Sequence, residues 1–342
     1  MERVTLKSVA KEAGFSVTTV SRVLGGADYP ISPEARECIT KTANRLGYVP
    51  NLLARSLKTR VSQEVALVVP TITNPFFTSV ILGAEAALAK RGYNMLFYMT
   101  STYPDRDSEL LTSIRSKMIA GVIIAADCIT REMVEPLRQM RASGVPVIVV
   151  DYATPLMDSP LGVFFDYYAG GQTAAQYLIA KGHRRVAFAT RALDKISRRS
   201  RKDGFVDAMS KAKAEFSERD VFISYQADEF QSGVELANEI LESAVPYTYT
   251  AIAASNDATA VGVITGLRAR GVRVPQEISV LGFDDCMFSM MASPLLTTIH
   301  VPSQDMGAMA AQLILEQING QQTLYSIQMK PKLIERDSVQ SI

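Results

Sequence analysis

From Gln63 onward the chain repeats one pattern: a short apolar run rich in β-branched residues, followed by an amphipathic stretch of helical period. The apolar runs lack polar alternation, which is typical of strands covered on both faces in parallel sheets. Eight such units are compatible with one large sheet, a closed barrel or two smaller open sheets. The predicted strands are 64–70, 93–98, 121–126, 145–151, 185–190, 221–225, 249–254 and 279–284, and the predicted helices are roughly 75–91, 106–117, 131–143, 168–181, 200–213, 231–242, 258–270 and 303–319.

Charge is divided unevenly along the chain. The formal net charge of +1 alone argues against a strongly basic nucleic-acid-binding protein. Residues 1–60, however, hold ten basic and five acidic residues, a net charge of +5, whereas residues 61–342 hold 26 basic and 30 acidic residues, a net charge of −4. This asymmetry indicates that any nucleic-acid contact is confined to the N-terminal part.

Capping signals predict three short helices in this part. Thr5 is expected to cap a first helix that runs to about Ala13, before Gly14. Ser16 is expected to cap a second helix that ends at Gly25-Gly26. A third helix begins at Ser32-Pro33-Glu34 and runs to about Leu46, because an N-cap residue, a proline and an acid agree there.

The second helix has two different faces. Val20, Val23 and Leu24 form an apolar stripe, and the opposite face is small and polar. This arrangement matches a helix-turn-helix unit whose second helix enters the major groove, although a small protein–protein module remains an alternative on spacing alone. Arg22 can reach a guanine or a phosphate, and valine and threonine methyl groups can contact thymine. The candidate DNA-contacting residues here are Thr5, Ser16, Val17, Thr18, Thr19, Ser21 and Arg22.

Signatures of catalysis, membrane insertion and metal binding are missing from the sequence. It contains no G-x-S-x-G, G-x-x-x-x-G-K, H-E-x-x-H or G-x-G-x-x-G motif, so no catalytic residue is proposed. His183 is expected to be structural, and Cys38, Cys128 and Cys286 are expected to be small core residues, so neither a metal site nor a cofactor is predicted. No apolar run is long enough to span a membrane, and the start lacks a secretory signal, so a cytoplasmic protein is expected.

Several motifs, in order along essentially the whole chain, resemble one known family. The segments TLKSVAKEAGFSVTTVSRVL and ISPEARECITKTANRLGYVPNLLARSLKT are similar to the DNA-binding head of the lactose-repressor/galactose-repressor (LacI/GalR) family of bacterial transcription regulators. The similarity continues through ALVVPTITNPFF, GVPVIVVD, GHRRVAF, the R-x-x-G-F of Arg201 to Phe205, ASNDATAVG, VPQEISVLGFDD and PLLTTIHVP. The resemblance implies a sequence-specific, nucleoid-associated regulator, most often a repressor of carbohydrate-utilisation genes.

The resemblance also implies a domain plan. Residues 1–50, hereafter the head, would be the helix-turn-helix domain, and residues 51–62 the hinge helix and linker. Residues 63–342, hereafter the core, would resemble periplasmic sugar-binding proteins: two doubly wound parallel-sheet subdomains with a cleft between them and dimerisation surfaces outside it. The expected subdomains are about 63–162 with 292–322, and about 163–291 with 323–342.

The hinge segment, NLLARSLKT, is too short for an independently stable helix. By the resemblance it would order on the operator and insert an apolar side chain into the minor groove, kinking the duplex. Leu57 would be that wedge, although an ordinary linker with Leu57 docked on the core is the alternative. The contacts implied for this segment are Asn51, Ala54, Arg55 and Leu57.

Ligands of open parallel sheets bind beyond the carboxyl ends of the strands, where the informative residues of the core fall. Carboxylates, an amide, an arginine and aromatic faces suit a sugar. The motif matches imply effector contacts at Asn74, Phe76, Phe77, Asp166, Arg201, Asn256 and Asp284. Around the family's usual strand-end aromatic this chain has the acidic pair Asp228-Glu229, and Tyr167 stands where many relatives have Asn.

The partners expected from the resemblance are a near-palindromic double-stranded operator, a second copy of the chain and a small sugar or sugar derivative, with no membrane. The basic run KISRRSRK places Lys195, Arg198, Arg199, Arg201 and Lys202 at one edge of the cleft. Most of the run is expected to be solvated surface, although an acidic sugar derivative as effector is a minority hypothesis. Three further hypotheses stay open: an effector that is a protein corepressor, a sugar-binding transport component and a Rossmann-type enzyme. Effector identity, operator sequence and the direction of regulation do not follow from the sequence.

Overall fold

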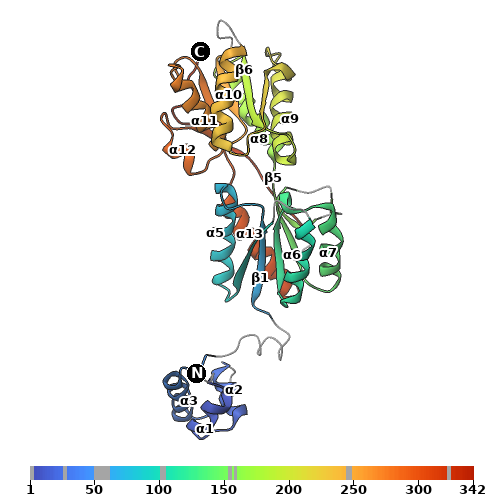
Figure 1. Ribbon diagram of the computed structural model, residues 1–342, viewed down its shortest axis with the longest axis vertical. Coiled ribbons are helices and arrows are strands. Elements are labelled where there is room, and N and C mark those ends of the chain that lie inside the picture. The colour runs from blue at the N-terminus through green and yellow to red at the C-terminus, as the bar shows by residue number, and fades with distance from the viewer. Residues whose placement is uncertain are drawn as a thin grey trace. The chain divides into compact units, whose positions relative to one another are not determined.

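The computed structural model describes residues 4–25, 29–49, 62–100, 105–152, 156–157, 160–243, 249–321 and 325–342 (Figure 1). The chain divides into two compact units, residues 1–62 and 63–342. Within the described ranges, no helix has both the length and the apolar character needed to cross a membrane.

The head contains three helices, α1 (Leu6–Ala13), α2 (Val17–Leu24) and α3 (Pro33–Leu46). The predicted caps are confirmed: Thr5, Ser16 and Ser32 each accept a hydrogen bond from a backbone N–H in the first turn. Six buried residues, from all three helices, form the centre of a small core: Val9, Ala10, Val20, Val23, Ile39 and Ala43.

The three cysteines do not share one environment. Cys128 is buried and Cys286 is half-buried, but Cys38 is exposed, so the expectation that all three are core residues is wrong. Cys38 lies beside Ile39 on α3, and it is Ile39 that faces the core. His183, by contrast, is fully buried and bonded through both ring nitrogens, to Thr250 and to the Gln340 carbonyl, as a structural residue would be.

The core is built on two six-stranded sheets. Neighbouring strands are parallel throughout, except that the final strand of the second sheet is antiparallel. The first sheet, of subdomain one, has the order β11 (Ile327–Met329), β5 (Gly162–Phe165), β4 (Val147–Asp151), β3 (Gly121–Ala125), β1 (Glu64–Val69), β2 (Asn94–Met99). The second, of subdomain two, has the order β12 (Lys332–Ile334), β10 (Thr297–His300), β9 (Ser279–Asp284), β8 (Ala251–Ala254), β6 (Val186–Arg191), β7 (Val221–Ser224).

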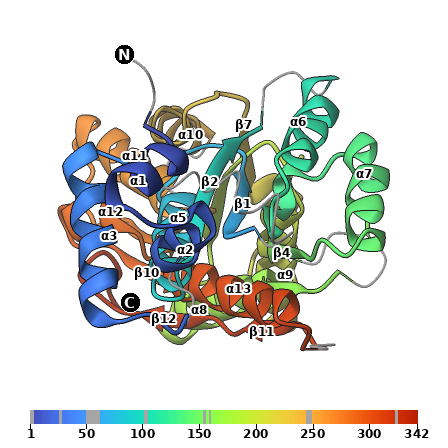
Figure 2. The same ribbon diagram turned by 90° about the horizontal axis from the view of Figure 1, so that it is seen from below.

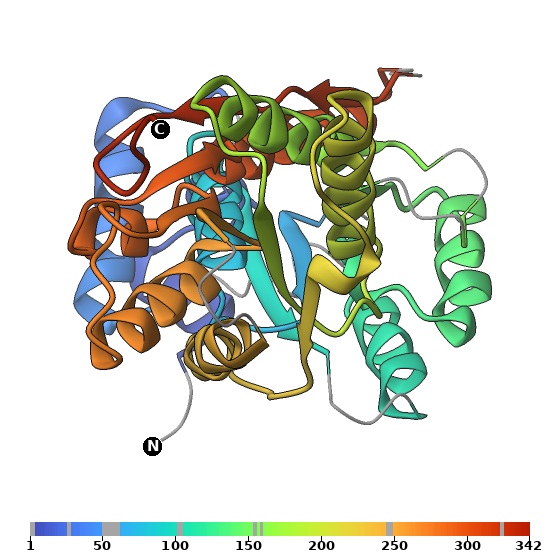
Figure 3. The ribbon, with the colours of Figure 1, turned by 90° about the horizontal axis from the view of Figure 1, so that it is seen from above.

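Helices cover both sheets in pairs. In subdomain one, α5 (Pro75–Ala89) packs against α13 (Ser303–Ile318), and α6 (Asp105–Ser116) lies with α7 (Arg131–Ala142) (Figure 2). In subdomain two, α8 (Tyr167–Ala180) packs against α9 (Ile196–Lys211), and α10 (Glu229–Ser243) against α11 (Asp257–Ala269) (Figure 3). A short helix, α12 (Met287–Met291), follows β9, and one-turn helices span Ala126–Cys128 and Glu218–Asp220. The eight predicted strand–helix units are thus present as two open doubly wound sheets.

Three crossovers connect the subdomains, between β5 and α8, between β10 and α13, and between β11 and β12. The sheets place the divisions differently from the expected ones. Strand β5 (162–165) and strand β11 (327–329) belong to the first sheet, and β10 (297–300) belongs to the second. These strands are only three or four residues long and lie at or near sheet edges. The sequence therefore contains no long apolar run that predicts them.

Candidate functional site

A polar cleft lies between the two subdomains, where strands of both sheets end. The cavity enclosed there has a volume of about 50 Å³. Subdomain one and subdomain two both contribute to its wall. The cleft residues are Asn74, Phe76, Phe77, Asp127, Asp151, Tyr167, Lys195, Ser197, Arg198, Arg201, Glu229, Asn256 and Asp284.

Arg201 is the centre of the subdomain-two wall. Its guanidinium donates a hydrogen bond of 3.0 Å to the Asp284 carboxylate and another to the Ser255 carbonyl. The same guanidinium lies over two aromatic rings, 4.6 Å from the centre of Tyr167 and 4.1 Å from that of Phe283. Because Arg201 is only 8% exposed, these contacts fix it in one orientation.

Two glycines allow this grouping, because they let α8 and α9 approach closely. A Cβ atom at Gly171 would lie 2.0 Å from the Arg201 carbonyl oxygen, and one at Gly204 would lie 2.0 Å from that of Tyr168. Any larger residue at either place would push the helices apart. The glycine of the R-x-x-G-F motif therefore positions Arg201 beside Tyr167.

Two polar contacts cross the cleft from one subdomain to the other. The Tyr167 hydroxyl donates a short hydrogen bond to Asp151 at the end of β4. The Lys195 ammonium lies 3.8 Å from the Asp127 carboxylate, which also accepts a hydrogen bond of 2.7 Å from Tyr152. The subdomains are thus linked by paired polar groups as well as by the chain crossovers.

Burial changes the acidity of the cleft carboxyls. It raises the pKa of Asp151 to about 8, with the nearby charge of Asp127 adding to the effect. It also raises the pKa of Asp284 to about 6, although the Arg201 charge opposes the shift. Both residues end a buried strand and have a positive backbone angle φ, 100° for Asp151 and 113° for Asp284. Residues other than glycine rarely adopt this backbone conformation.

A further acid lies beneath this wall. Asp257 is fully buried and accepts hydrogen bonds from the Thr298 hydroxyl, at 2.5 Å, and from the Cys286 backbone N–H, at 2.8 Å. Burial, followed by the charge of Asp284, raises its pKa to about 8. Asp257 therefore ties the start of α11 to the loop after β9 and to β10.

Six of the seven predicted effector residues lie in the cleft. Asn74 and Asn256 also cap α5 and α11, because their side-chain oxygens accept hydrogen bonds of 3.0 and 2.8 Å from the backbone N–H groups of Phe76 and Thr259. Phe76 and Phe77 pack edge to face, with ring centres 5.0 Å apart. Asp166 is not among the cleft residues: it caps α8 by accepting a 2.9 Å hydrogen bond from Ala169, next to Tyr167.

Seven residues of the wall were not among the predicted effector contacts, although Lys195 and Arg198 were expected at the edge of the cleft. These seven are Asp127, Asp151, Tyr167, Lys195, Ser197, Arg198 and Glu229. The expectation that most of KISRRSRK is solvated is wrong, because Arg198 and Lys202 are 16% exposed and both are paired with acids. Asp151 could have been predicted from the sequence as a cleft residue, since it ends an apolar strand just as Asp284 does.

The head presents a different polar surface. Thr5, Ser16 and Thr19 are engaged in capping contacts, among them a 2.8 Å hydrogen bond between the Ser16 and Thr19 hydroxyls. The side chains of Val17, Thr18 and Arg22 are exposed, and Ser21 is half-buried. Arg22 lies 4.9 Å from the ring centre of Tyr29. This face of α2 is available for contact with another molecule.

The predicted hinge contacts Asn51, Ala54, Arg55 and Leu57 lie outside the described residues. Within the part of the chain that the structure describes, no group of three or more His, Cys, Asp or Glu side chains is placed to hold a metal ion.

A three-helix head with an exposed second helix, followed by two sheets around a polar cleft, defines a DNA-binding regulator with a ligand-sensing domain. Family models agree in both parts. Residues 5–51 match bacterial regulatory proteins of the lacI family, and residues 62–336 match the periplasmic binding proteins and sugar binding domain of the LacI family. The chain belongs to the LacI family of bacterial transcriptional regulators.

Similar proteins include a ribose operon repressor of Escherichia coli (strain K12), 33% identical over 98% of this chain and 99% of the relative. The HTH-type transcriptional repressor PurR of Haemophilus influenzae (strain PittEE) is 31% identical over 99% of each chain. By fold, the chain is similar to a lac repressor dimer bound to operator and the anti-inducer ONPF, with a TM-score of 0.85 at 22% identity over 99% of this chain and all of that one. These relatives are named as repressors, not as enzymes.

Proposed function

We propose that this regulator represses carbohydrate-utilisation genes and that a small neutral sugar in the cleft controls its affinity for the operator. The observation that supports this most is the composition of the cleft wall. Hydrogen-bonding carboxylates and a fixed arginine lie beside aromatic rings, and both subdomains contribute. Sugar hydroxyls bind to such polar groups, and the apolar side of a sugar ring packs on aromatic faces. The proposed roles are binding roles, and none is catalytic.

The size of the cavity suggests how the signal arises. Ligand pockets usually enclose roughly 300–1,000 Å³, far more than the volume of about 50 Å³ in this cleft. A sugar therefore requires the walls to separate, and the Lys195–Asp127 and Tyr167–Asp151 contacts cross the line of separation. Sugar binding would then replace these contacts and reorient one subdomain against the other.

The neutral class of effector follows from the pairing of the cleft cations. Arg198 contacts Glu229 and Arg201 contacts Asp284, and both pairs lie within subdomain two, so they persist when the walls separate. An acidic sugar derivative would have to displace one of these carboxylates. The hydroxyl groups of a neutral sugar can instead donate hydrogen bonds to the same carboxylate oxygens while each carboxylate stays paired with its cation.

In the head, we propose that the exposed face of α2 contacts the major groove. Thr18 and Val17 would contact base edges, and Arg22 would contact a guanine or a phosphate. For the linker we retain the proposal that Leu57 is a minor-groove wedge: Leu57→Ala would weaken operator binding far more than binding to random DNA, whereas Arg55→Ala would act mainly through phosphate attraction. Because its target is chromosomal DNA, the protein would act in the cytoplasm, at the nucleoid.

We propose a homodimer, because a near-palindromic operator is matched by two heads related by symmetry. Exposed apolar side chains offer surface for a second copy. Met287, Met290 and Met291 on α12 are 56%, 58% and 70% exposed, and Leu82 on α5 is 57% exposed. Coupling between the sites is reciprocal, so operator DNA would change sugar affinity by the same factor by which sugar changes operator affinity.

The experiment begins with an operator selected from a random DNA pool by the purified full-length protein. Neutral monosaccharides and disaccharides are then screened by thermal shift, and those that bind are titrated into the protein–operator complex while fluorescence anisotropy is followed. We expect at least one neutral sugar to lower operator affinity fivefold or more, with no such effect in Arg201→Met. Stable operator binding that no sugar alters would contradict the proposal.

A further inference from the structure

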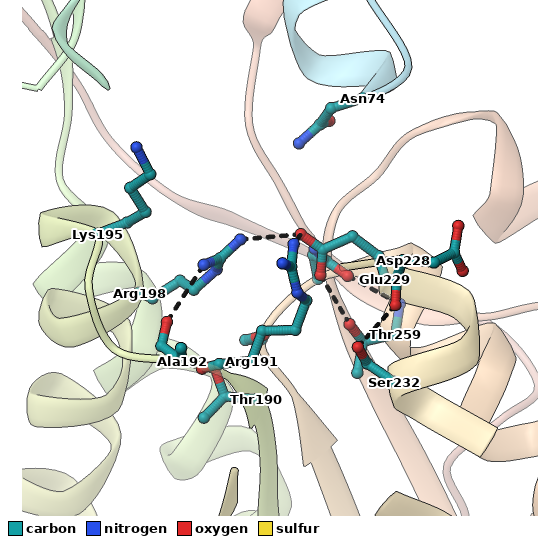
Figure 4. Close-up of polar contacts among 12 residues, drawn as sticks. Asn74, Thr190, Arg191, Ala192, Lys195, Arg198, Asp228, Glu229, Ser232 and Thr259 are labelled. Carbon is teal, nitrogen blue, oxygen red and sulfur yellow. Dashed lines mark hydrogen bonds and ion pairs between the residues drawn. The ribbon is translucent and has the colours of Figure 1, made fainter. Parts of the chain in front are cut away.

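Glu229, the first residue of α10, is held by two arginines from different elements. Its Oε1 atom accepts hydrogen bonds of 3.1 Å from Arg191 and 2.9 Å from Arg198 (Figure 4). The other carboxylate oxygen accepts a 3.3 Å hydrogen bond from the Thr259 hydroxyl. The three charged side chains are 16–22% exposed, so the cluster is screened from most of the solvent.

Both guanidinium groups are also anchored without Glu229. Arg191 donates a 2.7 Å hydrogen bond to the Gln226 carbonyl, and Arg198 donates to the Ala192 carbonyl at 3.2 Å and to Asp194 at 3.1 Å. These bonds hold the two arginines beside each other independently of the carboxylate between them. A paired arginine site of this kind favours carboxylates and phosphates.

The cluster faces the proposed effector cavity. Arg198 and Glu229 are both cleft residues, and Asn74 lies opposite them at the start of α5, in the other subdomain (Figure 4). Their charges also reach Asp284: after burial and Arg201, the Glu229 charge raises the pKa of Asp284 and the Arg198 charge lowers it.

Several features keep the Glu229 carboxylate in place. Its position in the first turn of α10 is favourable for a negative charge, because the backbone N–H groups there point toward it. Asp228 fixes the start of that helix by accepting a 2.8 Å hydrogen bond from the Gln231 backbone. An incoming anion would have to break the contacts of Glu229 with both arginines and with Thr259. Removing one partner of such a cluster is costly.

We propose that Glu229 determines the charge specificity of the cleft: it occupies a two-arginine site from within and thereby excludes anionic effectors such as sugar acids and sugar phosphates. The inference deepens the proposed function, on which it rests. It also gives a physical role to the acidic residue that stands near the usual strand-end aromatic. In this chain, the segment around Asp228 and Glu229 would discriminate between neutral and anionic effectors.

The test uses inorganic phosphate as the probe, because it is the smallest anion that two arginines bind well. Isothermal titration calorimetry at constant ionic strength compares the full-length wild type with Glu229→Gln, which keeps the shape of the side chain but removes its charge. Glu239→Gln, on an exposed position of the same helix, is the matched control. The double variant Glu229→Gln/Arg198→Gln removes one of the freed arginines.

We expect Glu229→Gln to bind phosphate at least tenfold more tightly than the wild type and Glu239→Gln, and the double variant to lose this gain. Phosphate affinity equal in the wild type and Glu229→Gln, whether weak or strong, would overturn the proposal. Strong binding by both would identify Glu229 as a displaceable stand-in for an anionic ligand.

A second measurement covers the case in which Glu229→Gln does not fold, as judged by circular dichroism. Wild-type protein is titrated with matched pairs such as glucose and glucose 6-phosphate, or galactose and galacturonate. We expect that no anionic member binds more tightly than its neutral partner, and a tenfold preference for an anion would refute the exclusion. The phosphate titration uses no operator DNA. A failure of the charge-exclusion proposal can therefore be distinguished from a failure of the proposed sugar-controlled repression, which only the operator titrations test.

Discussion

The two polar surfaces proposed to bind other molecules have opposite characters. On α2 of the head, Val17, Thr18 and Arg22 are exposed, whereas Val20 and Val23 pack in the core of the head. In the cleft of the core, Arg201, Asp151 and Asp284 are nearly buried. Arg201 is paired with Asp284, and Asp151 accepts a hydrogen bond from Tyr167. The difference teaches that the proposed binding residues are separable from the packing of the fold in the head but are part of that packing in the cleft.

The strongest way to break this contrast is Arg201→Met. The change leaves the Asp284 carboxylate buried without its guanidinium, and losing one partner of a buried pair costs about 3–5 kcal/mol. Urea denaturation of the full-length protein should show this loss, together with the loss of the sugar response. Arg199→Ala is the control on the same helix, because the Arg199 side chain is exposed and donates to backbone carbonyls at the start of the helix. A loss below about 1 kcal/mol for Arg201→Met would show that the buried pair is not structural.

Asp257→Asn tests the same coupling through pH. The folded pKa of Asp257 is raised to about 8 from an ordinary value of 3.8, so its proton favours the folded state. Its contribution to stability is fully present below about pH 4 and is lost as the pH rises toward 8, at a rate approaching about 1.4 kcal/mol per pH unit.

In urea titrations at pH 5, 6, 7 and 8, the free energy of unfolding should therefore fall more steeply with pH in the wild type than in Asp257→Asn. Asp203→Asn, at an exposed position, should keep the wild-type slope. Parallel curves for the wild type and Asp257→Asn would mean that Asp257 is ionised in the fold.

Tyr167→Phe removes one hydroxyl and leaves the ring that supports Arg201. The buried Asp151 carboxyl then loses its donor, which should cost about 1–3 kcal/mol and raise its pKa further, since the Tyr167 hydrogen bond lowers it. The adjacent Tyr168→Phe is the matched control, because Tyr168 is 42% exposed. Equal unfolding free energies in the two variants would place the Tyr167–Asp151 contact outside the stable core.

Arg22→Ala in the head should have the smallest effect on stability, under about 1 kcal/mol, because among the described residues it removes an exposed cation–π contact with Tyr29. Its effect on operator binding should be larger, about 1–3 kcal/mol if Arg22 contacts a base. Anisotropy titrations over a range of salt concentrations separate the two roles, since losing a phosphate contact lowers the salt dependence of binding to every sequence, whereas losing a base contact weakens binding to the operator. If Arg22→Ala lowered the free energy of unfolding by as much as it lowered the free energy of operator binding, the head would not differ from the cleft in this respect.

The same contrast explains what the sequence can predict. The head follows from local signals, and the helices capped by Thr5, Ser16 and Ser32 begin where expected. The longer strands and helices of the core follow from periodicity. The short strands β5, β10, β11 and β12 do not, because pairing with neighbours, rather than their own composition, makes them strands.

Within the cleft, the residues found in advance belong to motifs or follow obvious strands. Glu229 was missed because its partner Arg198 is 31 positions away, and only the folded sheet brings the two side chains together. Lys195 and Asp127 meet across two subdomains for the same reason. Ion pairs between residues far apart in the sequence produce no periodic pattern. A basic run is therefore predicted to be solvated when its acidic partners come from other parts of the chain.

The strand orders of the two sheets match position by position, with β4 in the place of β9. Each of these strands ends in an aspartate with positive φ, Asp151 in one and Asp284 in the other. The two walls are therefore variations on a single architectural plan, related as two halves of a duplicated unit would be. One half directs its aspartate to a tyrosine and the other to an arginine. A ligand between them meets the same scaffold twice with different chemistry, which lets a pseudo-symmetric frame recognise an asymmetric molecule.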